Sequence, residues 1–338
     1  MQVISFNKID LLKKQISEYD RSQRFVLYDT NTESHCSKLI HSLLPELRKA
    51  HLIITEAGDH NKTLKRCKII WKTLAEKEAT RDAILINVGG GMITDLGGYC
   101  AANYKRGIDF INIPTSLLGM VDASIGGKTG VNFLNYKNQI GVFANAKSVL
   151  IHPRFLDTLP RNELHSGLAE MIKHQLIFNP NAVADILNRK TMKQWISSET
   201  IQESIAFKQS IVDQDYRDEG IRQCLNFGHT MGHAIESLSY EKKTPLLHGE
   251  AIILGMIEEL KLSENRWNTS PDLRAMLMAV RKVYFPFLKF SYRFEKLIPF
   301  LKQDKKNKTE IGFSLLEAAG KPKLHINISL EDLQNELA

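Results

Sequence analysis

The sequence predicts an α/β domain with a mostly parallel sheet, followed by an all-α domain. Its 338 residues suit about two domains of ordinary size. In the first half, short β-type runs alternate with longer helical segments, which is typical of a parallel sheet covered by helices. In the second half the β-type runs nearly vanish, and apolar residues recur at helical spacing.

Short apolar runs give the expected strands of the first domain. They lie at residues 24–28, 51–55, 83–88, 110–113 and 148–151. Each is rich in β-branched, aromatic or leucine residues and is separated from the next by a segment long enough for a crossover helix. The run 83–88 is apolar nearly throughout, which indicates a strand buried on both faces.

Amphipathic segments at residues 163–177, 200–213 and 249–265 give the expected helices of the second domain. The boundary is expected where Ile151-His152-Pro153 ends the last strand and Thr158-Leu159-Pro160 precedes a helix. We therefore expect domains at residues 1–155 and 156–338.

The composition is that of an ordinary globular protein. Hydrophobic residues make up 43% and charged residues 25% of the chain, which argues against disorder and fibrous classes. No apolar run approaches the ~18 residues of a membrane span, and the N-terminus lacks a signal-peptide pattern, so we expect a cytoplasmic protein without membrane association. The four cysteines show no CxxC spacing.

The net charge of +7 could favour nucleic acid or small anionic substrates. Basic residues are mostly interleaved with acidic ones, so a nucleic-acid-binding function would rest on net charge alone, and we expect none. The dense basic cluster at residues 302–308 has the composition of a solvated loop.

A glycine turn, Gly89-Gly90-Gly91, follows the expected strand 83–88 and leads into a helical pattern. Backbone N–H groups at such a helix start suit a phosphate or pyrophosphate. The spacing is not GxGxxG, because Thr94 stands in the place of the third glycine. A plain tight turn is the alternative.

The segment 126–141 is glycine-rich and carries Lys128, Lys137 and Asn138. This composition suits a loop that closes over an anion, and a flexible surface loop is the alternative. It is not a Walker A loop, because Asp122 stands where that motif requires its first glycine.

His229 and His233 stand at positions i and i+4, on one face of any helix formed there. That geometry suits a metal, and spacing alone favours these two as a ligand pair. His248 and Glu170 could complete a zinc site with nitrogen and oxygen ligands. Thr230 occupies the place of the glutamate base in HExxH, which disfavours peptide hydrolysis of that type.

Taken together, these segments resemble the 3-dehydroquinate synthase family of the shikimate pathway, from about Asp29 to Lys323. The resemblance is carried by Gly89-Gly90-Gly91 with Asp95, Lys105-Arg106-Gly107, residues 114–118 and 121–132, Lys137-Asn138, residues 170–173, the block around His229, and His248-Gly249-Glu250. Departures are Asp59 for a usual Glu, Ser116 for a Thr and Ala123 for a Ser.

The resemblance implies a Rossmann-like N-terminal domain that binds NAD, and a helical C-terminal domain that binds a divalent metal, usually zinc, with cobalt possible. The implied metal ligands are Glu170, His229 and His248, which makes His233 a neighbour of the substrate phosphate and a proton carrier. The implied cofactor-binding positions are Asp29, Asp59, Lys62, Gly90, Gly91, Asp95, Thr115, Ser116, Asp122, Lys137, Thr158 and Glu163.

The implied catalytic positions are Lys128, Lys173, Lys208, Arg222, Asn226 and His233. The further substrate-binding positions are Arg106, Asp122, Asn138 and Lys305, with Lys306 as the alternative to Lys305. Substrate would lie between the domains, and Arg106 would reach across the interface of a homodimer.

The implied reaction converts the seven-carbon keto-acid phosphate DAHP into 3-dehydroquinate and phosphate, a carbon–oxygen lyase reaction in which NAD is returned unchanged. The alternatives are another sugar-phosphate cyclase, of the 2-deoxy-scyllo-inosose or 2-epi-5-epi-valiolone synthase type, and a metal-dependent polyol dehydrogenase of the glycerol type.

Overall fold

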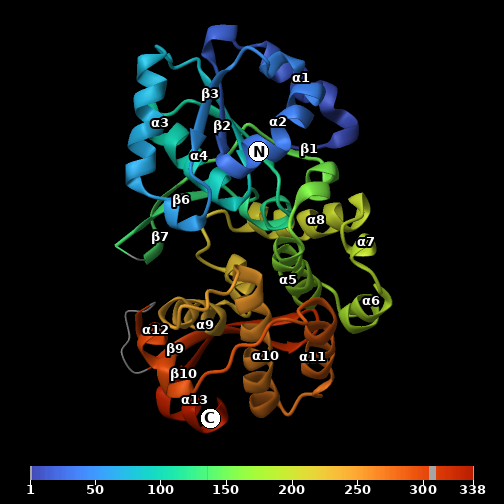
Figure 1. Cartoon of the computed structure of the whole chain (residues 1–338). Coiled ribbons are helices and arrows are strands. Elements are labelled where there is room, and N and C mark those ends of the chain that lie inside the picture. The colour runs from blue at the N-terminus through green and yellow to red at the C-terminus, as the bar shows by residue number, and fades with distance from the viewer. Residues whose placement is uncertain (1, 135, 304–309, 338) are drawn as a thin grey trace. The chain divides into compact units, whose positions relative to one another are not determined.

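The computed structural model describes residues 2–134, 136–303 and 310–337 (Figure 1). The chain forms two compact units, Met1–Pro160 and Arg161–Ala338. Lys305 and Lys306 lie outside the described residues.

The N-terminal unit is built on a six-stranded sheet with the order β1-β8-β5-β4-β2-β3. All its pairings are parallel, which confirms the predicted fold class for this half. The strands are β1 (Gln2–Ser5), β2 (Arg24–Asp29), β3 (His51–Thr55), β4 (Ile84–Gly89), β5 (Asp109–Pro114) and β8 (Ser148–Ile151). Five of them match the predicted runs, and β1, at the sheet edge, is an addition.

The strand order reverses beside β2. The chain runs outward from β2 to β3, then returns to β4 on the other side of β2 and continues to β5 and β8. In open parallel sheets, ligands bind where the order reverses, at the carboxyl ends of the strands. Every residue of β2 and β4 is buried, as expected for central strands covered on both faces.

The main helices of this unit are α1 (Ile9–Ser17), α2 (Thr30–Leu43), α3 (Leu64–Glu76) and α4 (Gly91–Asn103). Helix α4 approaches its strand closely, because a Cβ on Gly97 would lie 1.9 Å from Asn87 Oδ1 of β4. The buried Asn87 amide in turn donates to Asn112 Oδ1 of β5 at 2.9 Å. This contact holds the middle of α4 against β4.

The segment expected as a glycine-rich loop is an antiparallel hairpin, β6 (Lys128–Phe133) and β7 (Tyr136–Phe143). The expectation of a loop was wrong for a local reason. Gly130 and Gly141 face each other across the ladder, and a Cβ on Gly141 would lie 2.5 Å from Thr129 O. Glycine is depleted in strands, so a pair required by close backbone approach hides the strand pattern.

The C-terminal unit is mainly helical, as predicted. Its helices are α5 (Arg161–Phe178), α6 (Ala182–Asn188), α7 (Met192–Trp195), α8 (Ser198–Gln214), α9 (His229–Glu241), α10 (His248–Trp267), α11 (Asp272–Tyr284), α12 (Ile298–Gln303) and α13 (Leu330–Leu337). The three predicted helical segments fall in α5, α8 and α10. No helix in the described part of the chain is long and apolar enough to cross a membrane.

The all-α expectation missed a hairpin formed by β9 (Glu310–Ala318) and β10 (Lys321–Ser329). Strand β10 exposes alternate polar side chains, and Pro322 lies inside it, which is a signal against a strand. The hairpin closes at Gly320, whose φ of 73° suits glycine.

Candidate functional site

Three side chains able to bind a metal converge in the C-terminal unit. Glu170 lies on α5, while His229 and His248 are the first residues of α9 and α10. Glu170 Oε1 lies 3.7 Å from His229 Nε2 and 3.5 Å from His248 Nε2. One ligand atom from each residue lies within 4.8 Å of the other two. One carboxylate and two imidazoles from three helices form a donor set that suits zinc with an open position.

Close packing at two glycines sets this convergence. A Cβ on Gly249 would lie 2.1 Å from Ser166 O, so α10 begins directly against α5. A Cβ on Gly255 would lie 2.1 Å from Gly228 O, so α10 also crosses the start of α9 at backbone contact. The helix ends that carry the ligands are therefore held together by the backbone itself.

The Glu170 carboxylate is the clearest sign that a cation fits here. It is fully buried, and its oxygens accept no hydrogen bond from a backbone N–H group of the described residues. Lys173 forms an ion pair with Oε2, while Oε1 faces the two imidazoles. A buried carboxylate requires a compensating charge or donor, and a divalent cation between Oε1 and the two Nε2 atoms would supply it.

The charges of the three groups are set by their surroundings. Burial opposes ionisation of Glu170, but Lys173 and the two histidines outweigh it and hold the pKa of the carboxyl well below its usual range. Burial, then Lys173, holds the pKa of His229 well below its ordinary value, which keeps the imidazole in the neutral form that binds metals. Burial would lower the pKa of His248, but Glu170 and Glu236 outweigh it and raise that pKa to about 9.

His233 lies beside Glu170, His229 and His248 but is not grouped with all three as a possible metal ligand. Its ring centroid is 5.1 Å from that of His229 and 5.9 Å from that of His248. The structure groups His229 with Glu170 and His248, whereas His233 falls in a second group with Glu236 and His248. The His233 side chain is exposed.

Buried cations stand on elements that pack together. Lys173 lies on α5, Lys208 on α8 and Arg222 on a 3₁₀ helix, Ile221–Asn226, and these elements contact one another. The three side chains are almost fully buried, although Lys and Arg rarely are unless paired. Arg222 donates to Tyr216 O at 2.6 Å. Such burial of positive charge favours an anionic ligand.

Asn226 ends the same 3₁₀ helix and is exposed. Glu163, near the start of α5, is half-buried, and burial followed by the nearby Glu250 raises the pKa of its carboxyl.

In the N-terminal unit, predicted cofactor positions meet at one lysine. Lys62 Nζ lies 3.0 Å from Asp95 Oδ2, 3.6 Å from Asp59 Oδ1 and 2.5 Å from Asn138 Oδ1. Lys137 Nζ lies 3.7 Å from Asp59 Oδ2. Burial opposes the Lys62 charge, but the two carboxylates outweigh it and raise its pKa, whereas burial raises the pKa of Asp95.

The carboxyl ends of the central strands carry the other cofactor positions. Asp29 ends β2 and caps α2, accepting from Asn31 N and Thr32 N. Gly90 is the N-cap of α4 and offers no side-chain cap to that helix, so the first amides of α4 can point at an anion. A Cβ on Gly90 would lie 3.1 Å from Ser116 Oγ, and Thr115 N donates to Gly89 O at 3.0 Å.

Four further predicted positions lie on other elements of the N-terminal unit. Asp122 lies in a π-helical turn, Gly119–Ala123, and Lys128 is exposed at the start of β6. Arg106 is exposed with a φ of 69°. Thr158 is exposed and lines a small pocket against α2.

Two residues beside the metal group were not singled out from the sequence. Glu236 lies two turns after His229 on α9, so its spacing could have placed it on the ligand face. Glu259 is fully buried on α10 and accepts from Gly228 N at 2.7 Å and Met231 N at 3.1 Å. No local sequence signal points to Glu259, because its partners are backbone groups on another helix.

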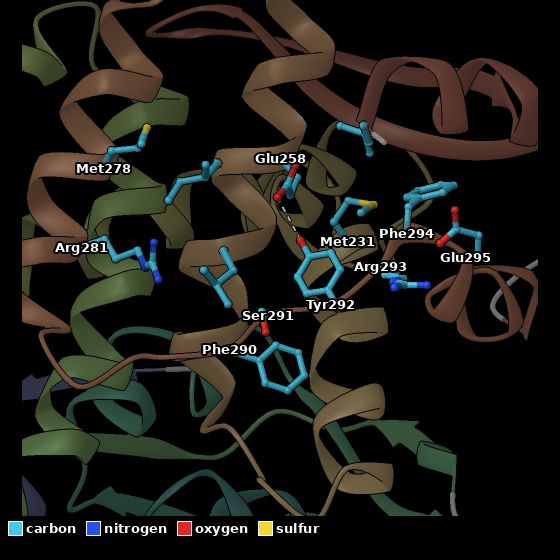
Figure 2. A pocket seen from close by; sticks show the side chains of 13 residues that line it. Met231, Glu258, Met278, Arg281, Phe290, Ser291, Tyr292, Arg293, Phe294 and Glu295 are labelled. Atoms are coloured by element: carbon cyan, nitrogen blue, oxygen red, sulfur yellow. Dashed lines mark hydrogen bonds between the residues drawn. The ribbon is translucent and has the colours of Figure 1, made fainter.

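A separate pocket of about 680 Å³ lies in the C-terminal unit (Figure 2). Met231 of α9, Glu258 of α10 and Arg281 of α11 line it, and Tyr292 OH donates to Glu258 Oε1 at 2.9 Å. Met231 stands two residues after His229, which directs it away from the His229 side of α9. None of the predicted site residues is among its described lining residues.

Comparison with known proteins supplies the family context. Residues 52–166 match the family described as 3-dehydroquinate synthase N-terminal, and residues 167–307 match 3-dehydroquinate synthase C-terminal. The 3-dehydroquinate synthase of Parabacteroides distasonis is 39% identical over 334 residues, which cover 96% of this chain and 94% of that protein.

Two solved structures share the fold. One is the 2-epi-5-epi-valiolone synthase ValA of Streptomyces hygroscopicus, with NAD⁺ and Zn²⁺ bound: TM-score 0.86, 22% identity, covering 99% of this chain and 95% of that one. The other is a 2-deoxy-scyllo-inosose synthase complexed with carbaglucose-6-phosphate, NAD⁺ and Co²⁺: TM-score 0.81, 23% identity, covering 96% and 93%.

Proposed function

Because the chain belongs to the 3-dehydroquinate synthase family, we propose that it converts DAHP into 3-dehydroquinate and phosphate. The observation that carries this proposal is the buried Glu170 carboxylate, which faces His229 and His248 on one oxygen and Lys173 on the other. The reaction comprises transient oxidation by NAD, phosphate elimination, re-reduction and intramolecular aldol closure.

The N-terminal domain is proposed to bind NAD. Support comes from the reversal of strand order beside β2, the uncapped start of α4 at Gly90, and the Lys62 cluster. The pyrophosphate would bind at the α4 amides, and Asp29 and Asp59 offer carboxylates for hydroxyl groups. The remaining proposed contacts are Gly91, Asp95, Thr115, Ser116, Asp122, Lys137, Thr158 and Glu163.

Glu170, His229 and His248 of the C-terminal domain are proposed to hold the divalent metal, which we take to be zinc. When bound, the metal would supply a Lewis acid that favours ionisation of a substrate hydroxyl and eases hydride transfer to NAD⁺. Lys173 keeps Glu170 ionised, and its ammonium stands ready to orient substrate hydroxyls beside that carboxylate.

Lys208 and Arg222 are proposed to bind the anionic groups of substrate, because each is a buried cation on elements that pack against α5. His233 is proposed to contact the phosphate and to carry a proton during elimination. Further proposed substrate contacts are Arg106, Asp122, Lys128, Asn138, Asn226 and Lys305. We propose a cytoplasmic homodimer in which Arg106 serves the partner subunit.

The alternatives differ in substrate. The cyclases that share the fold are 22–23% identical to this chain, whereas the synthase from Parabacteroides distasonis is 39% identical. This difference favours DAHP over a sugar phosphate. The buried set Lys173, Lys208 and Arg222 fits a phosphorylated acid better than an uncharged polyol such as glycerol.

The deciding experiment measures phosphate released from DAHP by the zinc-loaded protein with substoichiometric NAD⁺, while absorbance at the NADH band is followed. Many phosphates per NAD⁺, no lasting NADH and inhibition by a chelator are expected. Inert DAHP together with NADH accumulating from a polyol would overturn the proposal in favour of the dehydrogenase.

A further inference from the structure

His248 faces an acidic side chain on each of its ring nitrogens. Its Nε2 lies 3.5 Å from Glu170 Oε1, and its Nδ1 lies 3.6 Å from Glu236 Oε2. Glu236 is 3% exposed. One ligand atom each from His233, Glu236 and His248 also lie within 4.8 Å of one another, so Glu236 belongs either to a second metal site or to the support of the first.

The chemistry of imidazole separates these two possibilities. A neutral histidine that binds a cation through Nε2 carries its proton on Nδ1, and that N–H requires an acceptor. Glu236 provides one, because an ionised carboxylate only accepts hydrogen bonds. A second cation on Nδ1 would require His248 to lose that proton as well.

The other histidine ligand shows the same arrangement with a neutral acceptor. His229 Nδ1 lies 3.2 Å from Phe227 O, which leaves Nε2 for the side that faces Glu170. In both proposed histidine ligands, therefore, Nδ1 faces an acceptor oxygen and Nε2 faces Glu170. Helix α9 supplies His229 at its first residue and Glu236 two turns later, on the same face.

We propose that Glu236 is a positioning residue that accepts the Nδ1–H of His248 and holds its Nε2 toward the metal. The proposal rests on the metal site of the proposed function. It assigns Glu236 to one mononuclear centre and leaves His233 outside that centre as a ligand. Outer carboxylates of this kind typically contribute a factor of about 10–100 to metal affinity.

The test measures Zn²⁺ affinity and stoichiometry of the full chain by competition with a chromophoric chelator, after removal of bound metal. Glu236→Ala is expected to bind one equivalent of zinc about 10–100-fold more weakly than the unchanged chain. Glu236→Gln, which keeps an acceptor oxygen, is expected to recover part of that loss. Glu241→Gln, an exposed position on the same helix, is the matched control and is expected to bind zinc normally.

Two further readouts separate positioning from a structural role or a second site. Co²⁺-loaded Glu236→Ala is expected to show a shifted visible spectrum, because the coordination geometry changes, and His233→Ala is expected to keep one equivalent at unchanged affinity. Unchanged affinity and spectrum in both Glu236 variants would overturn the proposal. The proposal would also be overturned if the unchanged chain bound two equivalents of zinc and Glu236→Ala and His233→Ala each bound only one, because that result would indicate a second metal site. These outcomes need no DAHP, so inactivity toward DAHP would count only against the proposed reaction.

Discussion

Glu170 combines complete burial with an ionised carboxylate, which is unfavourable unless its charge is matched. Lys173 matches it from one turn away on α5, and the two imidazoles complete the surroundings. Because Glu170 Oε1 faces both imidazoles at once, the three side chains suit a cation as a set.

Replacing His248 by Ala is expected to remove most of the bound zinc, because two protein donors rarely retain zinc at ordinary concentrations. Elemental analysis of the desalted protein measures this directly. His41→Ala, at an exposed position on α2, serves as the control and should retain the zinc content of the unchanged chain. One full equivalent of zinc in His248→Ala would contradict the ligand assignment.

Glu163 makes stability depend on pH. Burial and Glu250 raise the pKa of its carboxyl in the folded protein, so folding favours the protonated form. This contribution is fully present below the ordinary value of 4.5 and is lost as the pH rises through the folded-state pKa.

Glu163→Gln is therefore expected to raise the urea midpoint of the metal-free protein at pH 8, with the gain shrinking as the pH falls toward 4.5. Urea unfolding at several pH values measures it, with Glu241→Gln as the control. A gain that is the same at every pH would assign the effect to packing instead of ionisation.

At the scale of elements, α9 has no side chain of its own to cap its first turn, because its N-cap is Gly228. Glu259 of α10 supplies the acceptor oxygens instead, to Gly228 N and Met231 N. A carboxylate at a helix N-terminus is favoured by the helix dipole. The contact therefore ties the start of one ligand-bearing helix to the middle of the other.

Gly255→Ala is expected to separate these two helices, because the added Cβ would lie 2.1 Å from Gly228 O and 2.5 Å from Gly232 N. Backbone atoms cannot move aside cheaply, so we expect a loss of about 1–3 kcal/mol in the free energy of unfolding together with weaker zinc binding. Urea unfolding and chelator competition measure the two effects. Asn265→Ala, exposed on α10, should change neither, and normal zinc affinity in Gly255→Ala would show that the crossing does not set the ligand spacing.

Strands and helices marked by an uninterrupted hydrophobic pattern could be predicted from the sequence. Strands whose glycine or proline residues interrupt that pattern could not. Strands β2 to β5 and β8 show as apolar runs, and α5, α8 and α10 show helical spacing. Strands β6 and β7 were hidden by the facing pair Gly130 and Gly141, and β10 by Pro322.

The candidate site, like the fold, was predictable only where a local sequence pattern marks it. Spacing favoured His233 as a partner of His229, because i and i+4 share a helix face. The structure instead brings in Glu170 and His248 from two other helices, which no local pattern can show. The residue types had already suggested Glu170 and His248 as candidates to complete the site, and the resemblance to a family removed His233 from the ligand set. The supporting contacts of Glu236 and Glu259 came only from the folded chain.

At the scale of the whole molecule, Arg106 is the residue whose role depends on assembly. It is exposed, with a φ of 69°, beside Lys105 at a φ of 50°. Left-handed backbone at two successive residues other than glycine is costly and is typical of segments held for function. The backbone strain favours a functional role for Arg106, and the proposed homodimer, which the family resemblance implies, assigns that role to the site of the partner subunit.

Mixing two inactive variants tests this expectation. Arg106→Ala and Lys173→Ala are each expected to lose nearly all turnover of DAHP. A mixed dimer contains one intact site, with Lys173 from the first variant and Arg106 from the second. If subunits pair at random, about half of the dimers are mixed, and each of these has one intact site of two. Co-refolded mixtures should therefore regain about a quarter of normal activity. Phosphate release measures the recovery. If Arg106 instead serves its own subunit, every site in the mixture lacks either Arg106 or Lys173, and the mixture stays as inactive as its components.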